Sequence, residues 1–344
     1  MYKVGSNTST KRIWFIGITV LILISPFVVY NLFLNLPISK TKIDVEFRVA
    51  NGESINTVIN NLNKKGLIKS KLLAKIYLKN QNINKTFKKG VYRFNTSMTP
   101  KDVFKKLING ELDPDILSFT VPEGYTVKQI ADKLVSKGVI KDADAFIKEA
   151  ENGKFDYEFL NNIPKDRPSR LEGYLFPDTY ELRKGMNERD IIIKMLDTFN
   201  YVYKTSLKEG LANSKLTLDD VVIMASIIER EAKSSEERPV IASVFYNRLN
   251  INMPLQSCAT VQYALGKTKP VLYFKDLEID SPYNTYKNAG LPVGPIANPG
   301  KDSLEAALNP AKTEFIYFVA KGDGTHHFTK DYNEFLRYKK LLNN

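Results

Sequence analysis

Apolar residues divide the chain into a long uncharged segment near the N-terminus and a body of mixed periodicity. Residues 13–34 contain no charged side chain, and fifteen of them are Ile, Leu, Val or Phe. A helix of this length reaches about 33 Å at about 1.5 Å per residue, enough to cross a hydrocarbon core of about 30 Å. The run is longer than the apolar part of a signal peptide, and no small-x-small cleavage pattern follows it. We therefore expect residues 13–34 to form an uncleaved, single-pass transmembrane helix.

The charges that flank this segment decide its orientation only weakly. Three basic residues precede it and three follow closely behind: Lys3, Lys11 and Arg12, then Lys40, Lys42 and Arg48. With the motifs described below, they favour a short cytoplasmic tail at 1–12 and a body on the outer face of the cell membrane.

An internal repeat emerges when the chain is compared with itself at a shift of 72 residues. Residues 46–68 read EFRVANGESINTVINNLNKKGLI, and residues 118–140 read SFTVPEGYTVKQIADKLVSKGVI. Each copy predicts a short alternating strand, a glycine turn, an amphipathic helix capped by Ser54 or Thr126, and a stop at glycine.

A second similar unit follows each copy, from Tyr92 and from Tyr180. Two related α+β modules, at 40–115 and 116–205, are the simplest interpretation, because a strand-helix pair this small cannot bury its faces alone. The modules resemble small LysM-type glycan-binding units, because they share a strand, a capped helix and a glycine that ends the helix. A packing repeat without a ligand remains equally open.

A third domain of mixed α+β structure is expected at 215–344. Its first helix, at 218–232, has a capping box from Thr217 and Asp220. The later elements are a helix opened by Ser234 and Glu237, a helix at 260–265, an irregular loop at 281–300, a helix from Ser303, strands at 315–320 and 326–328, and a terminal helix capped by Thr329.

Glu229 is misplaced on the first of these helices. At about 100° per residue, one arc of the helix is apolar; it comprises Leu218, Val221, Val222, Ala225, Ile228 and Ala232. Glu229 projects from its middle. A carboxylate buried without a partner tends to hold its proton, and an enzyme uses such an acid to protonate a leaving group. Pairing with an arginine such as Arg248, or a rotated helix, is an equally open explanation.

Basic residues are concentrated in one stretch. The net charge is +12, and residues 40–106 carry sixteen Lys and Arg against four acidic residues, so this stretch alone accounts for it. Behind a membrane anchor, such a segment lies within reach of anionic lipid headgroups or anionic wall polymers. Nucleic acid is the usual partner of such basicity, but a body facing away from the cytoplasm argues against it. A solvated lysine-rich face remains open.

The residue counts exclude several kinds of chemistry. Two histidines and one cysteine leave too few ligands for a nitrogen or sulfur metal site, and Cys258 alone permits no disulfide within the chain. No G-x-S-x-G occurs, and residues 294–303 fail the phosphate-loop pattern. We therefore expect no metal, nucleotide or organic cofactor.

Amide and phenol side chains gather on the loops that are expected to face Glu229. They are Asn247, Gln256, Tyr263, Tyr283, Asn284 and Tyr286. Amides bond sugar hydroxyls and aromatic rings stack on sugar faces, so with a buried acid these residues favour glycoside cleavage. We expect Gln256, Tyr283, Asn284 and Tyr286 to line a glycan cleft, although each such residue taken alone is more often structural.

Five stretches carry a resemblance to one family. They are EGYLFPDTY at 172–180, ASIIEREA at 225–232, ERPVIASVFYNRL at 237–249, LQSCATVQYALG at 255–266 and SPYNTYKNAGLPVGPIANPG at 281–300. Together they closely resemble the endolytic transglycosylases of bacterial cell walls, the MltG or YceG-like proteins. The resemblance extends from about residue 44 to the C-terminal region and includes the N-terminal anchor.

The resemblance implies a lytic transglycosylase that cuts the MurNAc-GlcNAc β-1,4 bond within nascent peptidoglycan strands and terminates their growth. The family's essential glutamate falls on Glu229. In lytic cleavage the C6 hydroxyl of N-acetylmuramic acid attacks its own anomeric carbon and leaves a 1,6-anhydro end. One carboxyl group can therefore protonate the glycosidic oxygen and then accept the hydroxyl proton. Peptidoglycan and the membrane are the implied partners, and cell-wall synthases are open as protein partners.

One departure from the family pattern is Cys258, at a position where we expect an acidic residue.

Two other functions stay open. A noncatalytic peptidoglycan-binding scaffold would hold glycan through its repeat modules and leave no new chain ends. A hydrolytic muramidase would need a second carboxylate and would leave a reducing sugar in place of an anhydro end.

Overall fold

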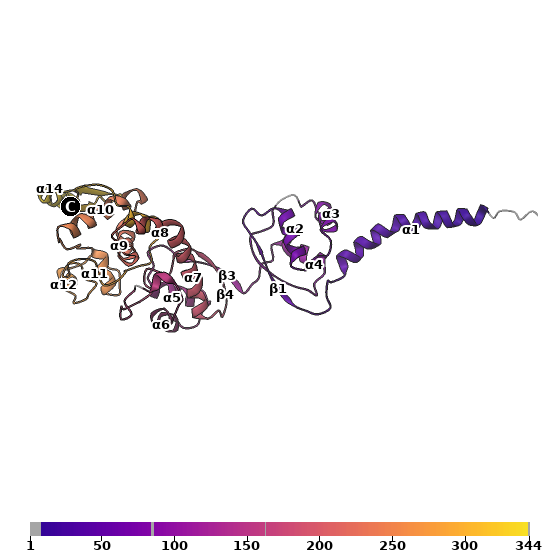
Figure 1. The fold of residues 1–344 in the computed structure, drawn as a ribbon, viewed down its shortest axis with the longest axis horizontal. Coiled ribbons are helices and arrows are strands. Elements are labelled where there is room, and N and C mark those ends of the chain that lie inside the picture. Colours follow the sequence, from indigo (N-terminus) through magenta and orange to yellow (C-terminus); the bar gives the residue numbers. More distant parts are fainter. Residues whose placement is uncertain (1–7, 84–85, 162, 343–344) are drawn as a thin grey trace, which may run out of the picture. The chain divides into compact units, whose positions relative to one another are not determined.

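The structure of the protein is a computed structural model that describes residues 8–83, 86–161 and 163–342 (Figure 1). The chain forms two compact units, Met1–Ile116 and Leu117–Asn344, which we call unit 1 and unit 2. Each unit has its own cluster of buried apolar side chains. The described residues thus combine helices with short strands, as the sequence predicts, in an α+β protein.

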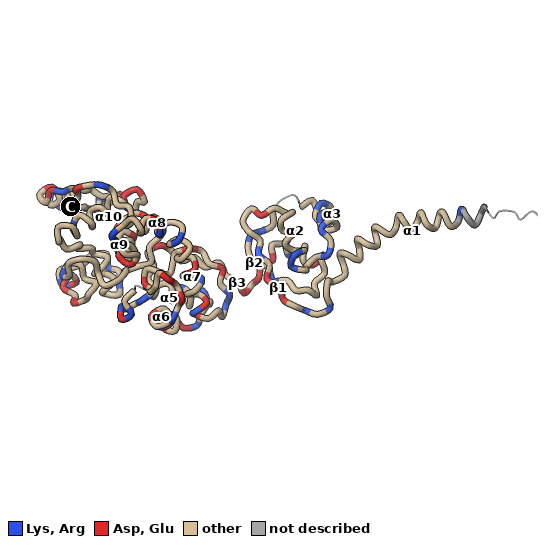
Figure 2. The backbone as a smooth tube through the Cα atoms, in the orientation of Figure 1, with Lys and Arg blue, Asp and Glu red and all other residues tan. Residues whose placement is uncertain are grey.

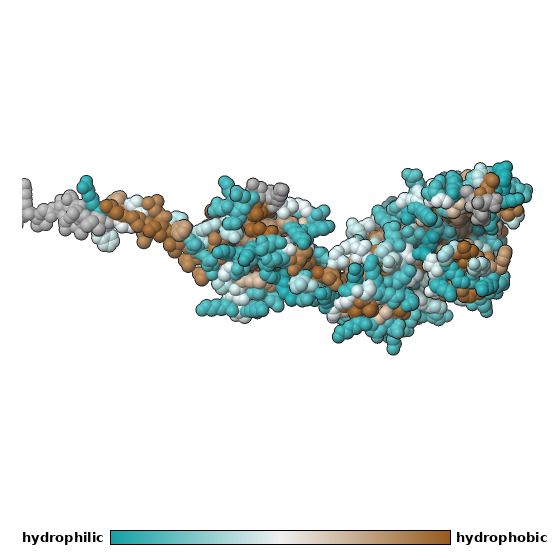
Figure 3. All heavy atoms as spheres, turned by 180° about the vertical axis from the view of Figure 1, so that it is seen from behind, coloured by the Kyte–Doolittle hydropathy of each residue, from teal (hydrophilic) through white to brown (hydrophobic). Residues whose placement is uncertain are grey.

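Unit 1 begins with α1 (Thr8–Asn35), which contains the expected apolar segment. Its residues Trp14–Asn35 are long and apolar enough to cross a membrane, by length and composition. Figure 2 shows no charged residue along this part of the helix, and Figure 3 shows apolar atoms over it. Thr19 Oγ1 and Asn31 Nδ2 donate to the carbonyl oxygens four residues earlier, at 2.8 Å and 3.0 Å. These bonds satisfy the polar groups inside the helix, as an apolar surrounding requires.

The rest of unit 1 is a module of two strands and three helices. Strands β1 (Asp44–Val49) and β2 (Gly90–Asn95) pair antiparallel, and helices α2 (Ile55–Lys64), α3 (Lys71–Asn80) and α4 (Pro100–Asn109) accompany them. The buried rings of Phe47, Phe94 and Phe104 lie in the core. Ser54 caps α2 as predicted, by accepting the amide hydrogen of Thr57.

The second copy of the repeat has the same order of elements. It comprises β3 (Ile116–Thr120), α5 (Val127–Ser136), α6 (Ala143–Asn152), β4 (Thr179–Arg183) and α7 (Glu188–Val202). β3, α5 and α6 each begin 72 residues after β1, α2 and α3. Strands β3 and β4 pair, as β1 and β2 do. The predicted repeat is therefore a repeat of structure as well as of sequence.

The two copies share a turn and differ by an insertion. Gly66 and Gly138 end the first helix of each copy with φ of 68° and 66°, a conformation that side-chain-bearing residues rarely adopt. Between its second helix and second strand, however, the second copy runs from 153 to 178, which is 17 residues more than the first copy has there. The inserted residues include the EGYLFP sequence.

The remaining elements of unit 2 follow the expected order. They are α9 (Leu218–Glu231), α10 (Arg238–Asn250), α11 (Cys258–Ala264), α13 (Lys301–Leu308), β5 (Tyr317–Ala320), β6 (His326–Thr329) and α14 (Tyr332–Leu342), with short helical turns at Glu158–Leu160, Tyr203–Leu207, Lys208–Ala212, Ser235–Glu237 and Phe274–Leu277. Thr217 and Asp220 form the predicted capping box. The predicted cap of the last helix is wrong: Asp331, not Thr329, accepts the amide hydrogen of Glu334, at 2.7 Å.

One core joins the segments that we expected as separate domains at 116–205 and 215–344. The same cluster of buried side chains includes Phe119 and Phe199 from the second repeat and Val221 and Leu304 from the later helices. Helix α9 runs through the middle of this unit, in contact with α10, α11 and α13 (Figure 1). The sequence changes in character between residues 205 and 215, but the hydrophobic core continues across that boundary.

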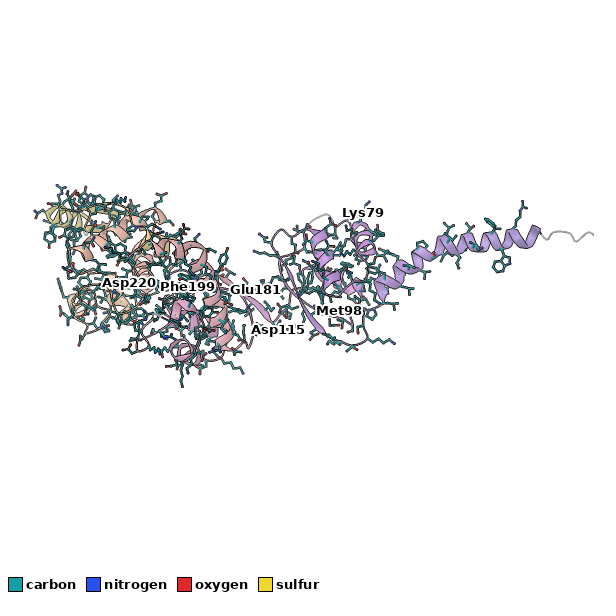
Figure 4. All side chains as sticks on the ribbon, viewed as in Figure 1. Lys79, Met98, Asp115, Glu181, Phe199 and Asp220 are labelled. Atoms are coloured by element: carbon teal, nitrogen blue, oxygen red, sulfur yellow. The ribbon has the colours of Figure 1, made fainter. Side chains whose placement is uncertain are left out.

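A substitution in this core tests that unity. Phe199 is fully buried in unit 2 (Figure 4), and its ring centroid lies 4.9 Å from that of Phe159 and 5.0 Å from that of Tyr174. We expect Phe199→Ala to lower the free energy of unfolding by about 3–5 kcal/mol, because it leaves a cavity. Hydrogen exchange should show peptides from 119–202 and from 218–308 losing protection together.

The matched control is Tyr201→Ala on the same helix. Tyr201 is 68% exposed, so its removal should change stability by less than about 0.5 kcal/mol. Protection lost in 119–202 alone after Phe199→Ala would show that unit 2 has two independent cores.

Candidate active site

Glu229 lies in the last turn of α9, and its side chain is only 7% exposed. The helix is more deeply buried than the predicted arc, because every residue from Val221 to Ile228 is buried. Packing of α10, α11 and α13 against α9 covers it on several sides. The position of Glu229 at the end of this buried stretch places its carboxyl group at the edge of the core.

The Glu229 carboxyl group has three hydrogen-bond donors around it. Oε2 accepts from the amide of Gly300 at 3.0 Å and from the hydroxyl of Ser303 at 2.8 Å, and Oε1 lies 3.4 Å from Arg238 Nη2. Gly300 is the N-cap of α13, so the helix dipole adds a partial positive charge. The expectation of an acid without partners is therefore wrong.

The arginine beside Glu229 is Arg238, not Arg248 as the open alternative named. Arg248 is buried and donates to the carbonyl oxygens of Ile316 and Leu255 at 2.7 Å and 2.6 Å. Burial lowers its pKa. Those carbonyl bonds hold Arg248 against the loops that follow α10, and it has a structural role there.

Arg238 connects several groups of the site. The residue is 7% exposed, and its Nε donates to Ser303 Oγ at 3.0 Å while Nη1 donates to Ser235 Oγ at 2.6 Å. Its Nη2, the nitrogen nearest Glu229, also lies 3.9 Å from Glu123 Oε2. Nη1 lies 4.0 Å from Asp302 Oδ2, so this single buried guanidinium has three carboxyl groups within 4.0 Å.

Glu123 is a second carboxyl group that sequence reasoning missed. It lies in the turn after β3, and its side chain is 53% exposed. A Cβ atom on Gly300 would be 1.9 Å from its Oε1, so the missing side chain at residue 300 leaves room for it. Burial, and next the charge of Glu229, raise the pKa of Glu123, while Arg238 lowers it. The repeat carried a signal, because the equivalent residue of the first copy is Asn51.

The loop at 281–300 has no helix or strand, as predicted, and hydrogen bonds hold it against the second repeat. The backbone carbonyl oxygen of Asn298 accepts from the amide of Gly124 at 2.9 Å. The side-chain Nδ2 of Asn298 donates to the carbonyl of Tyr125 at 2.8 Å. Ser226 Oγ accepts the amide hydrogen of Ile296 at 3.0 Å. These bonds bring the turn with Glu123 to the helix end with Glu229.

A cavity of about 490 Å³ opens beside this site, and Glu229 does not line it. Its wall comes from α5, α6, α11 and the loop before Glu172, and it includes Arg230. Arg230, which follows Glu229 in the chain, donates through Nη1 to the carbonyl of Gly124 at 3.4 Å. The cavity is of the size that small-molecule ligands occupy.

Glu172, in the inserted segment, is the deeply buried acid that lines this cavity. It accepts hydrogen bonds from the amide of Val127 at 3.0 Å, the hydroxyl of Tyr263 at 3.1 Å and Asn298 Nδ2 at 3.1 Å. Burial raises its pKa to about 8, and these bonds lower it only in part. The property predicted for Glu229, a carboxyl group that keeps its proton through burial, thus occurs at Glu172.

Two of the four predicted cleft residues are internal. Asn284 is fully buried, and its Nδ2 donates to the carbonyls of Leu277 and Ile279 at 2.8 Å each. Tyr283 is 6% exposed, and its hydroxyl donates to the carbonyl of Pro168 at 3.3 Å. Their polar atoms stabilise the loop. Asn247 and Tyr263 are likewise bonded within the protein.

The other two lie at the surface of the unit. Gln256 is exposed, with φ of 49°, an uncommon conformation for a residue other than glycine. Tyr286 is half-buried, and its hydroxyl lies 3.2 Å from Cys258 Sγ. Both Tyr286 and Cys258 line a second, open cavity of about 680 Å³ together with Tyr273 and Phe274. No hydrogen bond among the described residues joins either Gln256 or Tyr286 to Glu229.

Comparisons with known proteins show the family to which the chain is similar. The sequence model of the YceG-like family matches residues 47–341. An endolytic murein transglycosylase from Bacillus subtilis (strain 168) is 38% identical over 319 residues, which are 88% of this chain and 86% of the relative. One from Streptococcus pneumoniae (strain ATCC BAA-255 / R6) is 35% identical over 83% of this chain and 56% of its own length. A crystal structure of a yceG-like protein from Listeria monocytogenes, 34% identical, covers 86% of this chain and 98% of its own, with a TM-score of 0.59.

The raised pKa of Glu172 predicts a pH dependence of stability. The folded protein holds this proton up to about pH 8, whereas an unfolded carboxyl group loses it near 4.5. The stabilisation is therefore fully present below 4.5 and is lost as pH rises towards 8. The wild type should lose on the order of 4 kcal/mol of unfolding free energy over that range relative to Glu172→Gln, which cannot titrate.

Chemical denaturation at several pH values measures this difference. The contributions of the other titratable groups cancel in the difference between the two unfolding free energies, because both proteins contain these groups. Parallel stability curves for the wild type and Glu172→Gln would show that Glu172 does not carry the proton.

Proposed function

This chain belongs to the YceG-like family, and on that premise we propose that it is a lytic transglycosylase that cleaves within the glycan strands of peptidoglycan. Its relatives in Bacillus subtilis and Streptococcus pneumoniae bear the name endolytic murein transglycosylase. The observation that carries the proposal is the placement of Glu229, nearly buried among three donors beside a half-exposed second carboxyl group.

We propose Glu229 as the acid and then the base of the reaction. It gives its proton to the glycosidic oxygen as the bond from that oxygen to C1 of N-acetylmuramic acid breaks. The C6 hydroxyl then bonds to C1, and its proton passes to the Glu229 carboxylate, so the enzyme ends in its starting state. The product is a 1,6-anhydro end, and a growing strand cut in this way is terminated.

The donors around Glu229 support this cycle. Gly300, Ser303 and Arg238 all point hydrogens at its oxygens, and they stabilise the carboxylate that the first proton transfer leaves behind. Glu123 has the opposite effect and destabilises the Glu229 carboxylate, because two carboxylates near one another repel.

Substrate contacts are proposed from the surface of unit 2. Gln256 is exposed and Tyr286 is half-buried at the surface, and their polar groups suit sugar hydroxyls, whereas Tyr283 and Asn284 support the loop from inside. The cavity beside Arg230 is a candidate subsite for part of the strand. Both repeat modules resemble LysM-type units. The first is proposed to hold glycan away from the site, and the second, which carries Glu123, to hold it at the site.

The anchor sets the place of action. We propose that α1 spans the cell membrane once, with residues 1–12 in the cytoplasm and the body on the outer face, where peptidoglycan lies. The length and composition of Trp14–Asn35 support the anchor. The glycan strand and the synthases that extend it are the proposed partners.

Glu229→Gln tests the central assignment. The amide keeps the shape of the side chain and cannot supply a proton, so we expect cleavage to fall by about 100-fold to 10,000-fold. The measurement is mass spectrometry of 1,6-anhydro ends released from purified glycan strands. Glu236→Gln, an exposed neighbour, is the control and should cleave as the wild type does. Cleavage at the wild-type rate by folded Glu229→Gln would remove Glu229 from the mechanism.

A hydrolytic muramidase is a second candidate, because the site holds a second carboxyl group. Oxygens of Glu123 and Glu229 lie within 3.9 Å and 3.4 Å of one Arg238 nitrogen. Those two oxygens are therefore at most about 7 Å apart, within the range at which paired carboxyl groups of glycosidases act. A water held by Glu123 would then attack C1 in place of the C6 hydroxyl.

Cleavage in ¹⁸O-labelled water separates the two reactions. We expect anhydro ends without label in the wild type and in Glu123→Gln. Labelled reducing ends in the wild type, absent in Glu123→Gln, would establish the hydrolase.

A further inference from the structure

Helix α3 exposes apolar side chains on its outer face. Leu72 is 67% exposed and Ile76 is 40% exposed. They lie four residues apart, so they are neighbours on one side of the helix, while Ala74 and Leu78 face the core. Two large aliphatic side chains on a water-facing helix indicate a surface that contacts something apolar.

Lysines border these apolar residues. Lys71, Lys75 and Lys79 are all exposed and recur at a spacing of four residues, next to Leu72 and Ile76 around the helix. Figure 2 shows the basic residues of α3 in blue. No carboxylate of the described residues pairs with any of these three lysines. An apolar stripe beside a row of unpaired lysines is the pattern of a helix that lies in a membrane surface.

A groove lies between the last turns of α1 and the start of α3. This groove of about 290 Å³ is lined from one side by residues of α1 and the segment after it, including Leu32, Phe33 and Leu36, and from the other by Ser70 and Leu73 at the start of α3. Leu32 precedes the end of α1 by three residues, or about 5 Å along the helix axis. Whatever depth the end of α1 reaches, the beginning of α3 therefore lies at nearly the same depth.

We propose that Lys71, Leu72, Lys75, Ile76 and Lys79, the α3 face, form a binding surface for the anionic headgroups of the membrane that holds α1. Leu72 and Ile76 enter the boundary between headgroups and acyl chains, and the lysines extend their ammonium groups to lipid phosphates. The inference rests on the proposed membrane span of α1. It adds a second point of attachment, which stops the first module from swinging about the end of the anchor.

An anionic wall polymer is the other partner that the lysines could take. It would account for their charge but not for two exposed aliphatic side chains beside the end of an apolar helix. The position and the chemistry of the α3 face together favour the lipid surface.

The experiment uses the full chain with Cys258→Ser, so that a single introduced cysteine carries an environment-sensitive dye. Leu72→Cys and Ile76→Cys report on the α3 face, and Asn51→Cys, an exposed residue of the turn after β1, is the control. Each protein is inserted into vesicles of phosphatidylcholine alone or mixed with phosphatidylglycerol, with a quencher attached to the lipid headgroup. We expect quenching at residues 72 and 76 to exceed that at 51 several-fold in the anionic vesicles. Added salt, or Lys71, Lys75 and Lys79→Gln together, should reduce it.

Flotation of the vesicles separates this proposal from the anchor. A chain that does not float with vesicles would refute the span of α1. A chain that floats while residues 72 and 76 are quenched no more than 51 would refute the α3 face and leave the anchor intact. A response to soluble polyglycerol phosphate in neutral vesicles, without one to phosphatidylglycerol, would overturn the proposal in favour of a wall polymer.

Discussion

A buried arginine among three carboxyl groups, those of Glu229, Glu123 and Asp302, is the constraint on which the site depends. Arg238 is almost inaccessible to solvent, and an unpaired buried guanidinium would be costly. Glu229, Glu123, Ser235 and Ser303 compensate it, and these residues come from four separate parts of unit 2. Each must therefore be in place before the charge is satisfied, so folding of the unit and assembly of the site are the same event.

The second repeat differs from the first in the residues that it contributes to the candidate site. Both copies keep the same elements, but the second has a glutamate where the first has Asn51, and it holds an insertion that carries Glu172. Glu123 faces Glu229, and Glu172 bonds the start of α5 and Asn298. The module of unit 1 has neither acid. A repeat of one fold thus supplies a separate module in unit 1 and part of the candidate active site in unit 2.

Irregular segments do as much as helices to position these groups. Asn298 bonds the turn that follows β3 and also accepts from the amide of Leu175 in the insertion at 2.9 Å. Ser226 in α9 holds the same loop through Ile296. Because a loop without secondary structure must satisfy its polar groups elsewhere, its side-chain bonds decide its path, and that path sets the distance between Glu123 and Glu229.

The sequence by itself determined the features that depend on near neighbours in the chain. The apolar span, the repeat, the caps at Ser54 and Thr217 and the irregular loop at 281–300 follow from periodicity, propensity and capping, which act over a few residues. Helical periodicity also singled out Glu229, and the family resemblance agreed with that choice. Only the tertiary structure decided that Arg238 and not Arg248 reaches Glu229, that Glu123 joins them, and that Tyr283 and Asn284 turn inward. It also decided that Glu172 is the buried acid, because burial and pairing depend on residues about 40 to 130 positions away, and no local pattern encodes a contact at such a separation.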